Sequence, residues 1–494
     1  MTAIRYPLDY QWRCNPGNMR LALLKSGIRP PDIRVACELG FGQGGNLVLH
    51  AASGPAHWLG NDVNPEHVRE ARKLTQAAGA RADLHGDTFV EFAARDDLPD
   101  VDYIVVSGVW SWVSDRSRSA LLDFAKRRLK PGGVLFLGYV TLPGLAGFMP
   151  VRHLMAQHAK SLAGAGDIAE RVQRSLGFLE RTIVTLPSFL EDHPRIQKQI
   201  DALRDYKIEE LAHDYFSRDW RPMHFADVAS QFAEAGLVHA GKASYRDQIE
   251  ALSLTAAQRA LLADIDAPLF RETVSDFLLN RAGRYDYWMK PSDGAPQVVD
   301  DELRAERFVL IADRPELPFE ARAPLKLQGL EAEDQAITAV LEVLAQRRPR
   351  SVGDIEIALS GKATLAVIVE ALQILLGCRV VAHAQPEPAV EQARTTAARF
   401  NAFALDSIGT GTGIGHFASP LLGGGFRVRL PEQLFLKARR SGGGSPEKWV
   451  RFARQALASL DRTGKQALTE DQLATRAAAF AATQLPLLES LLIA

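Results

Sequence analysis

Residues 35–47, VACELGFGQGGNL, decide the fold of this chain. An apolar run ends in an acid, closely spaced glycines follow, and an apolar pattern with helical spacing continues beyond them. This order is typical of the first strand, turn and helix of a nucleotide-binding α/β unit, in which glycines let a ligand lie directly on the backbone. The turn fits both the dinucleotide fingerprint G-x-G-x-x-G and the acid-x-G-x-G-x-G pattern of S-adenosylmethionine (SAM) enzymes. The residues concerned are Glu38, Gly40, Gly42, Gly44 and Gly45.

Strand and helix patterns alternate on either side of this turn. Strands are predicted at 35–39, 58–62, 84–87, 101–106 and 134–140, with helices between them. This alternation indicates a parallel sheet wound by right-handed crossovers. From residue 151 to 215 the apolar spacing is helical, and a helix at 225–236 with strands at 237–245 and 284–289 then completes a seven-stranded, Rossmann-like sheet. The core is therefore predicted to be discontinuous.

Four segments follow from these patterns. We expect a SAM-binding core at 1–150, a helical insertion or lid at 151–220, a regulatory region at 221–297 that completes the sheet, and a mostly helical, winged-helix-like domain at 298–494. The third helix of that last domain, KATLAVIVEALQILLG at 362–377, is too apolar to face phosphates. Packing or dimerisation is therefore a better prediction for it than DNA binding. The glycine-rich runs at 409–415 and 423–425 are expected to be flexible loops, since neither ends like a P-loop.

Composition excludes several function classes. The 494 residues include 58 basic and 59 acidic side chains, so no overall field steers the chain toward nucleic acid or an anionic membrane. The N-terminus has no apolar signal segment and no apolar run is long enough to cross a bilayer, so we expect a cytoplasmic protein. Three scattered cysteines indicate neither disulfides nor a zinc site, and we predict no metal.

Acidic residues at successive strand ends distinguish between the two candidate cofactors. Asp62 follows the second strand, where a carboxylate can bind ribose hydroxyls, and Asp87 follows the third, where an acid and the Thr88 backbone can meet the adenine amine. The glycine turn can bind the aminoacyl end, with Glu38 orienting it. Any one such acid is more often a helix cap. Three of them around one turn favour SAM over a dinucleotide.

The chain resembles bacterial class I methyltransferases that carry a methyltransferase regulatory domain, a group that includes the protein-lysine methyltransferases acting on outer-membrane proteins. The resemblance covers most of the chain. It rests on DVNP at 62–65, GVWSWVS at 108–114, LKPGG at 129–133, LPG at 142–144, AHDYF at 212–216, WRPMHFA at 220–226, FRET at 270–273, ASP at 418–420 and EQLFL at 432–436.

The resemblance implies a SAM-dependent methyltransferase that N-methylates lysine on a protein and releases S-adenosylhomocysteine. Two alternatives remain: O- or N-methylation of a small molecule or glycan, and a non-catalytic SAM-binding module. The second is motivated by two departures from the family, in which a His commonly occupies the place of Ser107 and an Asn that of Val140. A nicotinamide oxidoreductase is the least favoured reading. A homodimer is compatible with the sequence.

An acceptor amine has to lose its proton before it attacks the methyl group. For a lysine with a pKa of about 10.4, this costs roughly 4.6 kcal/mol at pH 7, which a desolvating pocket and the sulfonium charge can offset. We therefore expect an aromatic acceptor pocket; its candidates are Trp110, Tyr139 and Tyr10, with Trp12 and Trp112, and core packing is the alternative for each. Ser107 is expected beside the cofactor. Arg13 either pairs with the SAM carboxylate or lies free on the surface.

Overall fold

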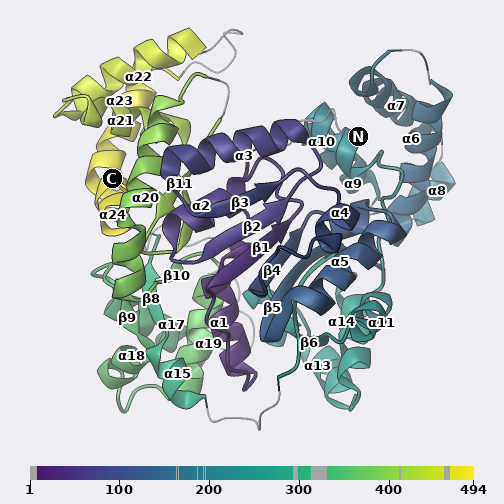
Figure 1. The fold of residues 1–494 in the computed structure, drawn as a ribbon, viewed down its shortest axis with the longest axis horizontal. Coiled ribbons are helices and arrows are strands. Elements are labelled where there is room, and N and C mark those ends of the chain that lie inside the picture. The colour runs from purple at the N-terminus through teal and green to yellow at the C-terminus, as the bar shows by residue number, and fades with distance from the viewer. Residues whose placement is uncertain are drawn as a thin grey trace.

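A seven-stranded sheet forms the centre of the molecule (Figure 1). The computed structural model describes residues 8–162, 164, 166–185, 187–192, 194, 196–292, 299–312, 331–410, 413–460 and 468–494. The strand order is β3-β2-β1-β4-β5-β7-β6. The strands are β1 Val35–Leu39, β2 His57–Asn61, β3 Ala82–His85, β4 Val101–Ser107, β5 Leu129–Val140, β6 Val238–Lys242 and β7 Gly283–Met289. β1 to β5 are parallel, whereas β7 is antiparallel to both of its neighbours. The predicted Rossmann-like sheet of seven strands is confirmed.

Helices cover both faces of this sheet. One face carries α1 Pro16–Lys25, α2 Gly45–Ser53 and α3 Pro65–Ala78, and the other carries α4 Phe89–Ala94, α5 Asp115–Arg128 and α11 Phe225–Glu234. α1 and α3 each begin with a Pro in the first turn and an Asn cap that accepts a backbone N–H. α5 begins at Asp115, where the Ser114 hydroxyl caps it.

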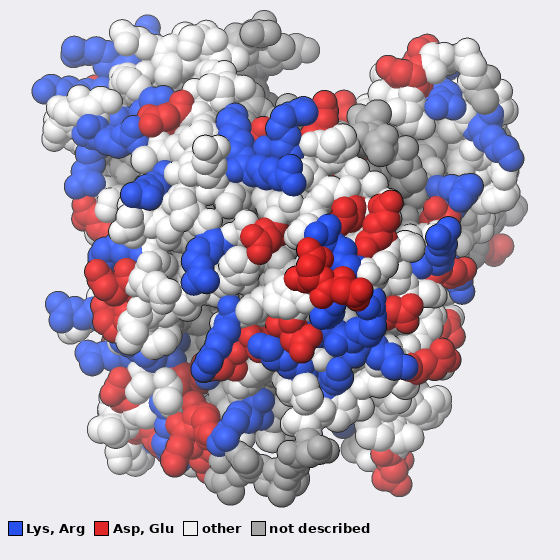
Figure 2. All heavy atoms as spheres, in the orientation of Figure 1, with Lys and Arg blue, Asp and Glu red and all other residues white. Residues whose placement is uncertain are grey.

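The sheet is completed only after an interruption. β5 is followed by α6 Met149–Ser161, α7 Ile168–Ile183, α8 Pro187–Asp192, α9 Ile196–Ala202 and α10 Ile208–Asp214, and these pack around a small apolar core of their own. This insertion projects as an arm on the right of Figures 1 and 2. The chain then returns through α11 and β6, and three short helices lead into β7: α12 Tyr245–Gln248, α13 Ala256–Ala263 and α14 Pro268–Leu279. The prediction of a discontinuous sheet is therefore confirmed.

The C-terminal region lies on the side of the sheet opposite the insertion (Figure 1). Its first part contains α15 Asp300–Ala305, β8 Arg307–Leu310, α17 Glu331–Leu344, β9 Arg350–Ser351, α18 Val352–Ala358, α19 Leu365–Gly377 and β10 Val381–His383. The three helices and the strand after them were expected. The short strands β8 and β9 were not, and they join β10 in a three-stranded antiparallel sheet.

The last part of the chain packs against the methyltransferase-like core. α20 Glu387–Asp406 contacts α2 and α3. A hairpin of β11 His416–Ser419 and β12 Gly424–Arg427 follows, and then α21 Leu430–Arg440, α22 Pro446–Leu460, α23 Glu470–Ala479 and α24 Leu485–Ser490, the last two joined by a π-helical turn. The prediction that 423–425 forms a flexible loop is wrong, because Gly424 and Gly425 are buried in β12. Part of the 409–415 run lies outside the described residues.

The surface agrees with the balanced charge of the sequence. Figure 2 shows acidic and basic side chains interspersed on this face, with one basic cluster over α3, where Arg69, Arg72 and Lys73 are exposed. No helix among the described residues is long and apolar enough to cross a membrane. The proposed four-segment boundaries stay a prediction; the boundary near residue 297 lies outside the described residues.

Candidate active site

The turn after β1 requires glycine at its centre. Gly40, Gly42 and Gly44 have φ values of 76°, 58° and 83°, in the left-handed region that other residues avoid. A Cβ on Gly40 would lie 2.6 Å from Val109 Cγ2, whereas a Cβ on Gly42 would have no heavy atom within 4 Å. The turn is therefore tightly packed at its start and open at its middle, as binding of a ligand to its backbone requires.

Glu38 lies at the base of this turn with one carboxylate oxygen unsatisfied. The side chain is buried, and its Oε1 accepts a hydrogen bond from Asn46 Nδ2 at 3.2 Å. Oε2 has no hydrogen-bond partner among the described residues. Burial raises the pKa of Glu38 to about 8, against the opposing effect of hydrogen bonds from Asn46 and the Leu47 backbone. A buried oxygen of this kind fits a cationic ligand group, and the ammonium of the SAM aminoacyl end is such a group.

Asp62 and Asp87 lie at the ends of β2 and β3, next to the β1 turn. Asp62 Oδ2 accepts the backbone N–H of Gly42 at 2.9 Å, and its Oδ1 accepts that of Asn64 at 2.8 Å. Asp87 pairs with Arg95 at 3.1 Å. Thr88 forms a capping box at the start of α4: its hydroxyl accepts the Glu91 N–H, and its own N–H donates to Glu91 Oε2 at 2.9 Å. Its carbonyl accepts the Phe92 N–H, so both backbone groups already have partners, and the adenine contact predicted for them stays a prediction. Because β3, β2 and β1 are neighbours, these groups share one edge of the sheet with Glu38.

The N-terminal residues 8–14, which we call the strap, lie across the start of α2. The Gln11 N–H donates to Asn46 Oδ1 at 2.6 Å, so Asn46 links the strap to Glu38. A Cβ on Gly45 would lie only 2.1 Å from the Asp9 carbonyl oxygen, which shows how closely the strap approaches the helix. The strap continues into Cys14, whose carbonyl accepts a hydrogen bond from the Tyr103 hydroxyl at 3.1 Å.

The strap carries Arg13 to the end of β4. Its guanidinium carbon lies 4.8 Å from the ring centroids of both Trp12 and Tyr285, and its Nε has no hydrogen-bond partner among the described residues. Burial raises the pKa of the Cys14 thiol, a hydrogen bond with Ser107 opposes this, and the charges of Glu38 and Arg13 also act on it. Ser107, Arg13 and Glu38 therefore all lie near one thiol. Their predicted contacts with the cofactor stay predictions.

Two family models match the chain at these elements. The model described as "Methyltransferase domain" matches residues 36–133, which contain the glycine turn, Asp62, Asp87 and Ser107. The chain is a SAM-dependent methyltransferase. A second model, "Predicted methyltransferase regulatory domain", matches residues 208–290 and thus spans α10, α11 and the two strands that complete the sheet of the methyltransferase.

Known proteins resemble the methyltransferase over all or part of its length. Uncharacterized protein sll1526 of Synechocystis is 29% identical, over 99% of this chain and 97% of the relative. Uncharacterized protein RP789 of Rickettsia prowazekii is 27% identical over 44% of this chain and 39% of its own length. The solved structure of PKMT2 from Rickettsia typhi in complex with AdoHcy has a TM-score of 0.68 and 17% identity, and covers 99% of this chain and 100% of that chain. The methyltransferase therefore shares that fold, including its C-terminal region.

The three predicted aromatic residues do not converge. Trp110 and Tyr139 lie in one core, where Trp110 packs on Phe232 at 5.2 Å and the Tyr139 hydroxyl donates to Asp286 at 3.1 Å. Tyr10 lies in the other core, on the opposite face of the sheet. All three are buried. The structure therefore does not bring Tyr10 together with the other two.

Tyr10 instead fixes the strap to the C-terminal hairpin. The Tyr10 hydroxyl lies 3.1 Å from His50 Nε2. Burial lowers the pKa of His50 to about 3, so its ring is neutral at pH 7 and can accept a hydrogen bond from that hydroxyl. On the other side, a Cβ on Gly424 would lie 2.1 Å from the Tyr10 hydroxyl oxygen. β12 is therefore glycine-rich where Tyr10 approaches it. This contact links the cofactor side of the core to the last third of the chain.

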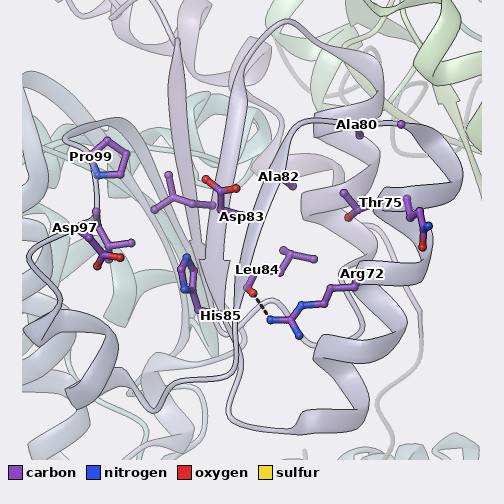
Figure 3. Close-up of a pocket in the computed structure, with 13 residues that line it drawn as sticks. Arg72, Thr75, Ala80, Ala82, Asp83, Leu84, His85, Asp97 and Pro99 are labelled. Carbon is purple, nitrogen blue, oxygen red and sulfur yellow. Dashed lines mark hydrogen bonds between the residues drawn. The ribbon is translucent and has the colours of Figure 1, made fainter.

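A large groove of the core lies elsewhere. It has a volume of about 860 Å³ and runs along β3, the edge strand, between α3 and residues 97–99 (Figure 3). Arg72 donates to the Leu84 carbonyl at 2.8 Å and so satisfies part of the free strand edge. We call Glu38, the glycine turn, Asp62 and Asp87 the cofactor cradle. None of these residues lines the groove, so the groove is distinct from the cradle.

Proposed function

We propose that this methyltransferase N-methylates lysine side chains of a protein substrate. The observation that carries the proposal is the chemistry around Ser107, whose described contacts include the Cys14 thiol but neither a carboxylate nor an imidazole base. Transfer to an aliphatic or sugar hydroxyl requires such a base. The full-length likeness to PKMT2 and the sequence resemblance to protein-lysine methyltransferases support the same substrate class.

The residues of the chain divide into two groups in this proposal. Glu38, the glycine turn, Asp62 and Asp87 hold the cofactor, and Arg13 pairs with its carboxylate through the unpartnered Nε. Bound SAM supplies an electrophilic methyl group on a cationic sulfonium. Holding the acceptor nitrogen in line with that methyl contributes roughly 7–11 kcal/mol of the barrier reduction.

The positive charge of Arg13 also acts on the acceptor. A nearby cation lowers the pKa of an amine, so a lysine that enters beside Tyr285 and Ser107 loses its proton more readily than in water. The carbonyl of Val140, at the end of β5, lies 3.4 Å from Ser111 Oγ, and its N–H donates to the same oxygen at 3.1 Å. The Trp-Ser-Trp segment thus fixes the strand end that faces the acceptor.

Radiolabelled SAM added with the purified enzyme to a fractionated cell lysate tests the proposal. We expect label in the protein fraction, recovered as methyllysine after hydrolysis, and none with an Asp62→Ala control that lacks the ribose contact. Label confined to small-molecule or glycan fractions would support the alternative acceptor class. Absence of product in single-turnover assays with every fraction would instead support a non-catalytic SAM-binding module.

The lid role of the insertion, the cytoplasmic location and a homodimer stay predictions. The insertion does reach the Trp-Ser-Trp segment, since Trp112 Nε1 donates to the Asp214 carbonyl at 3.3 Å and its ring stacks on His213. Such a contact is compatible with gating of the acceptor.

A further inference from the structure

Three arginines gather around the strap, two of them over a single indole. The guanidinium carbon of Arg13 lies 4.8 Å from the Trp12 ring centroid, and that of Arg379, just after α19, lies 5.5 Å from the same centroid. The third, Arg427, ends β12. Burial lowers the pKa of Arg379, and the positive charges of Arg13 and Arg427 lower it further. The three positive charges therefore repel one another when no anion is bound between them.

The described part of the chain pairs none of these three charges with an acidic side chain. Within the described part of the chain, Arg13, Arg379 and Arg427 take part in no ion pair. The strap's own acid, Asp9, directs Oδ1 to the Tyr10 N–H at 2.8 Å and lies 3.8 Å from His416 Nδ1. Clustered guanidinium groups without a carboxylate partner form a ready site for an anion.

The backbone of Arg379 is a second, independent observation. Arg379 has φ +58° and follows the C-cap of α19, with its N–H bonded to the Leu376 carbonyl and the next N–H bonded to that of Leu375. This helix-ending motif ordinarily places glycine at that position, because a side chain is strained there. An arginine occupies it instead. An arginine therefore gives this backbone conformation no stability that a glycine would lack. What the arginine adds at this position is its guanidinium group.

The cluster borders the acceptor side of the active site. Arg13 also lies over Tyr285, and a Cβ on Gly138 would lie 3.1 Å from the Tyr285 ring and 3.7 Å from Ser107 Oγ. A chain of neighbours thus runs from Ser107 through Gly138, Tyr285, Arg13 and Trp12 to Arg379. A group bound at Arg379 and Arg427 would lie within a few residues of an acceptor at Ser107.

We propose that Arg379 and Arg427, with Arg13 on the cofactor side of the cluster, bind the carboxylate of an Asp or Glu close in sequence to the methylated residue of a protein substrate. This inference rests on the proposed protein substrate. A lysine enters the site protonated and is repelled by three arginines. A neighbouring carboxylate removes that repulsion and positions the acceptor, so lysines flanked by acids are selected over lysines in basic segments.

The test compares two peptides on the full-length enzyme saturated with S-adenosylhomocysteine. One fluorescent peptide has a single lysine flanked by glutamates, and the other has glutamines in their place. We expect the glutamate peptide to bind about tenfold or more tightly, as for a charge-assisted pair, with the preference falling as salt rises. Fluorescence polarisation measures both affinities without requiring turnover.

Two variants with the same backbone change provide the control. Arg379→Gly removes the guanidinium at a position where glycine relieves strain, so the protein stays folded and the preference falls to about unity. Arg347→Gly makes the same replacement at φ +53°, after α17 and away from the strap, and leaves the preference intact. Titration with S-adenosylhomocysteine should give the same affinity in wild type and both variants.

Three outcomes would overturn the inference: equal or unmeasurable binding of both peptides, a preference that survives Arg379→Gly, or a loss of S-adenosylhomocysteine affinity in Arg379→Gly as large as the peptide loss. The last would assign the cluster to the cofactor carboxylate. Because no turnover is measured, a glutamate preference alongside unlabelled protein in the lysate assay would contradict the proposed function and leave the carboxylate site standing.

Discussion

The cofactor side and the acceptor side of this active site are built in different ways. The cofactor cradle uses three neighbouring strand ends and one glycine turn, all within about fifty residues of each other along the chain. The acceptor side that we propose is assembled from Ser107, Tyr285 and Arg379, with Arg13 between it and the cofactor, and these residues come from four distant segments. The cradle is therefore determined largely by strands, turns and helices that are close in sequence. The acceptor side forms only when distant segments of the chain have packed together.

Breaking the cradle should give the largest effect. Gly40→Ala adds a Cβ 2.6 Å from Val109 Cγ2 at φ 76°, which displaces the turn. We expect SAM affinity to fall by about 100-fold or more, measured by calorimetry, since backbone strain of this kind is worth roughly 1–3 kcal/mol before the clash is added. Gly27→Ala is the control, because it has φ 71° with open space around it, and it should lower stability only. Unchanged SAM affinity in Gly40→Ala would contradict the assignment of this turn.

The next effect concerns Glu38 and pH. With its pKa raised to about 8, the ionised fraction that can bind an ammonium grows steeply between pH 6 and pH 7.5. SAM affinity should therefore rise by more than about tenfold over that interval. In Glu38→Gln the dependence should disappear and affinity at pH 7.5 should be lower. A flat profile in the wild type would contradict the ammonium contact.

The same shift predicts the stability of the ligand-free enzyme. Because the folded-state pKa of Glu38 lies above the ordinary value of 4.5, its protonated form is favoured by folding. Its contribution is fully present below pH 4.5 and is lost as pH rises through 8. Urea denaturation should show Glu38→Gln to be more stable than wild type at pH 8 and similar to it near pH 4.5.

Displacing the strap should lower SAM affinity by a smaller factor, because the strap contacts the cradle through Asn46 and also carries Arg13. Gly424→Ala places a Cβ 2.1 Å from the Tyr10 hydroxyl oxygen, so the strap shifts and SAM affinity falls about tenfold, comparable to the loss of one buried contact. Tyr10→Phe removes that oxygen. The double variant should bind SAM more tightly than Gly424→Ala alone. If the losses of SAM affinity in the two single variants simply add in the double variant, the contact is contradicted.

Tyr139→Phe should have the smallest effect. It tests whether Tyr139 belongs to the acceptor side or to the packed core. The Tyr139 hydroxyl donates to Asp286, which also binds Arg284 at 2.9 Å within a buried cluster. Its loss should lower the free energy of unfolding by about 1 kcal/mol and leave kcat nearly unchanged. A large fall in kcat at unchanged stability would instead return Tyr139 to the acceptor pocket that the sequence predicts.

The same contrast explains which features the sequence could predict. Glu38, Asp62 and Asp87 follow apolar strand patterns, so their common edge follows from the topology of a parallel sheet. β6 and β7 could be predicted across the insertion because each has its own strand pattern. Arg379 and Tyr285 carry no local signal, since they meet the strap only through tertiary packing.

Local rules also fail where packing overrides propensity. The run at 423–425 was predicted to be a flexible loop because it does not end like a P-loop. Gly424 and Gly425 are strand residues instead, and Tyr10 occupies the space that their side chains would need. Asn46 carries no sequence signal for its contacts, although it links Gln11 to Glu38. Neither role can be recognised before the fold brings distant residues together.

The contact between Tyr10 and β12 has a consequence for biosynthesis. A ribosome that adds about 5–20 residues per second needs roughly 20–80 s between making these two segments. Until then the strap lacks its anchor, and a chain cut short before the hairpin would keep a complete sheet and an open cofactor cradle. We therefore expect tight binding of the methyl donor only after the hairpin at residues 416–427 has been made and has packed on Tyr10.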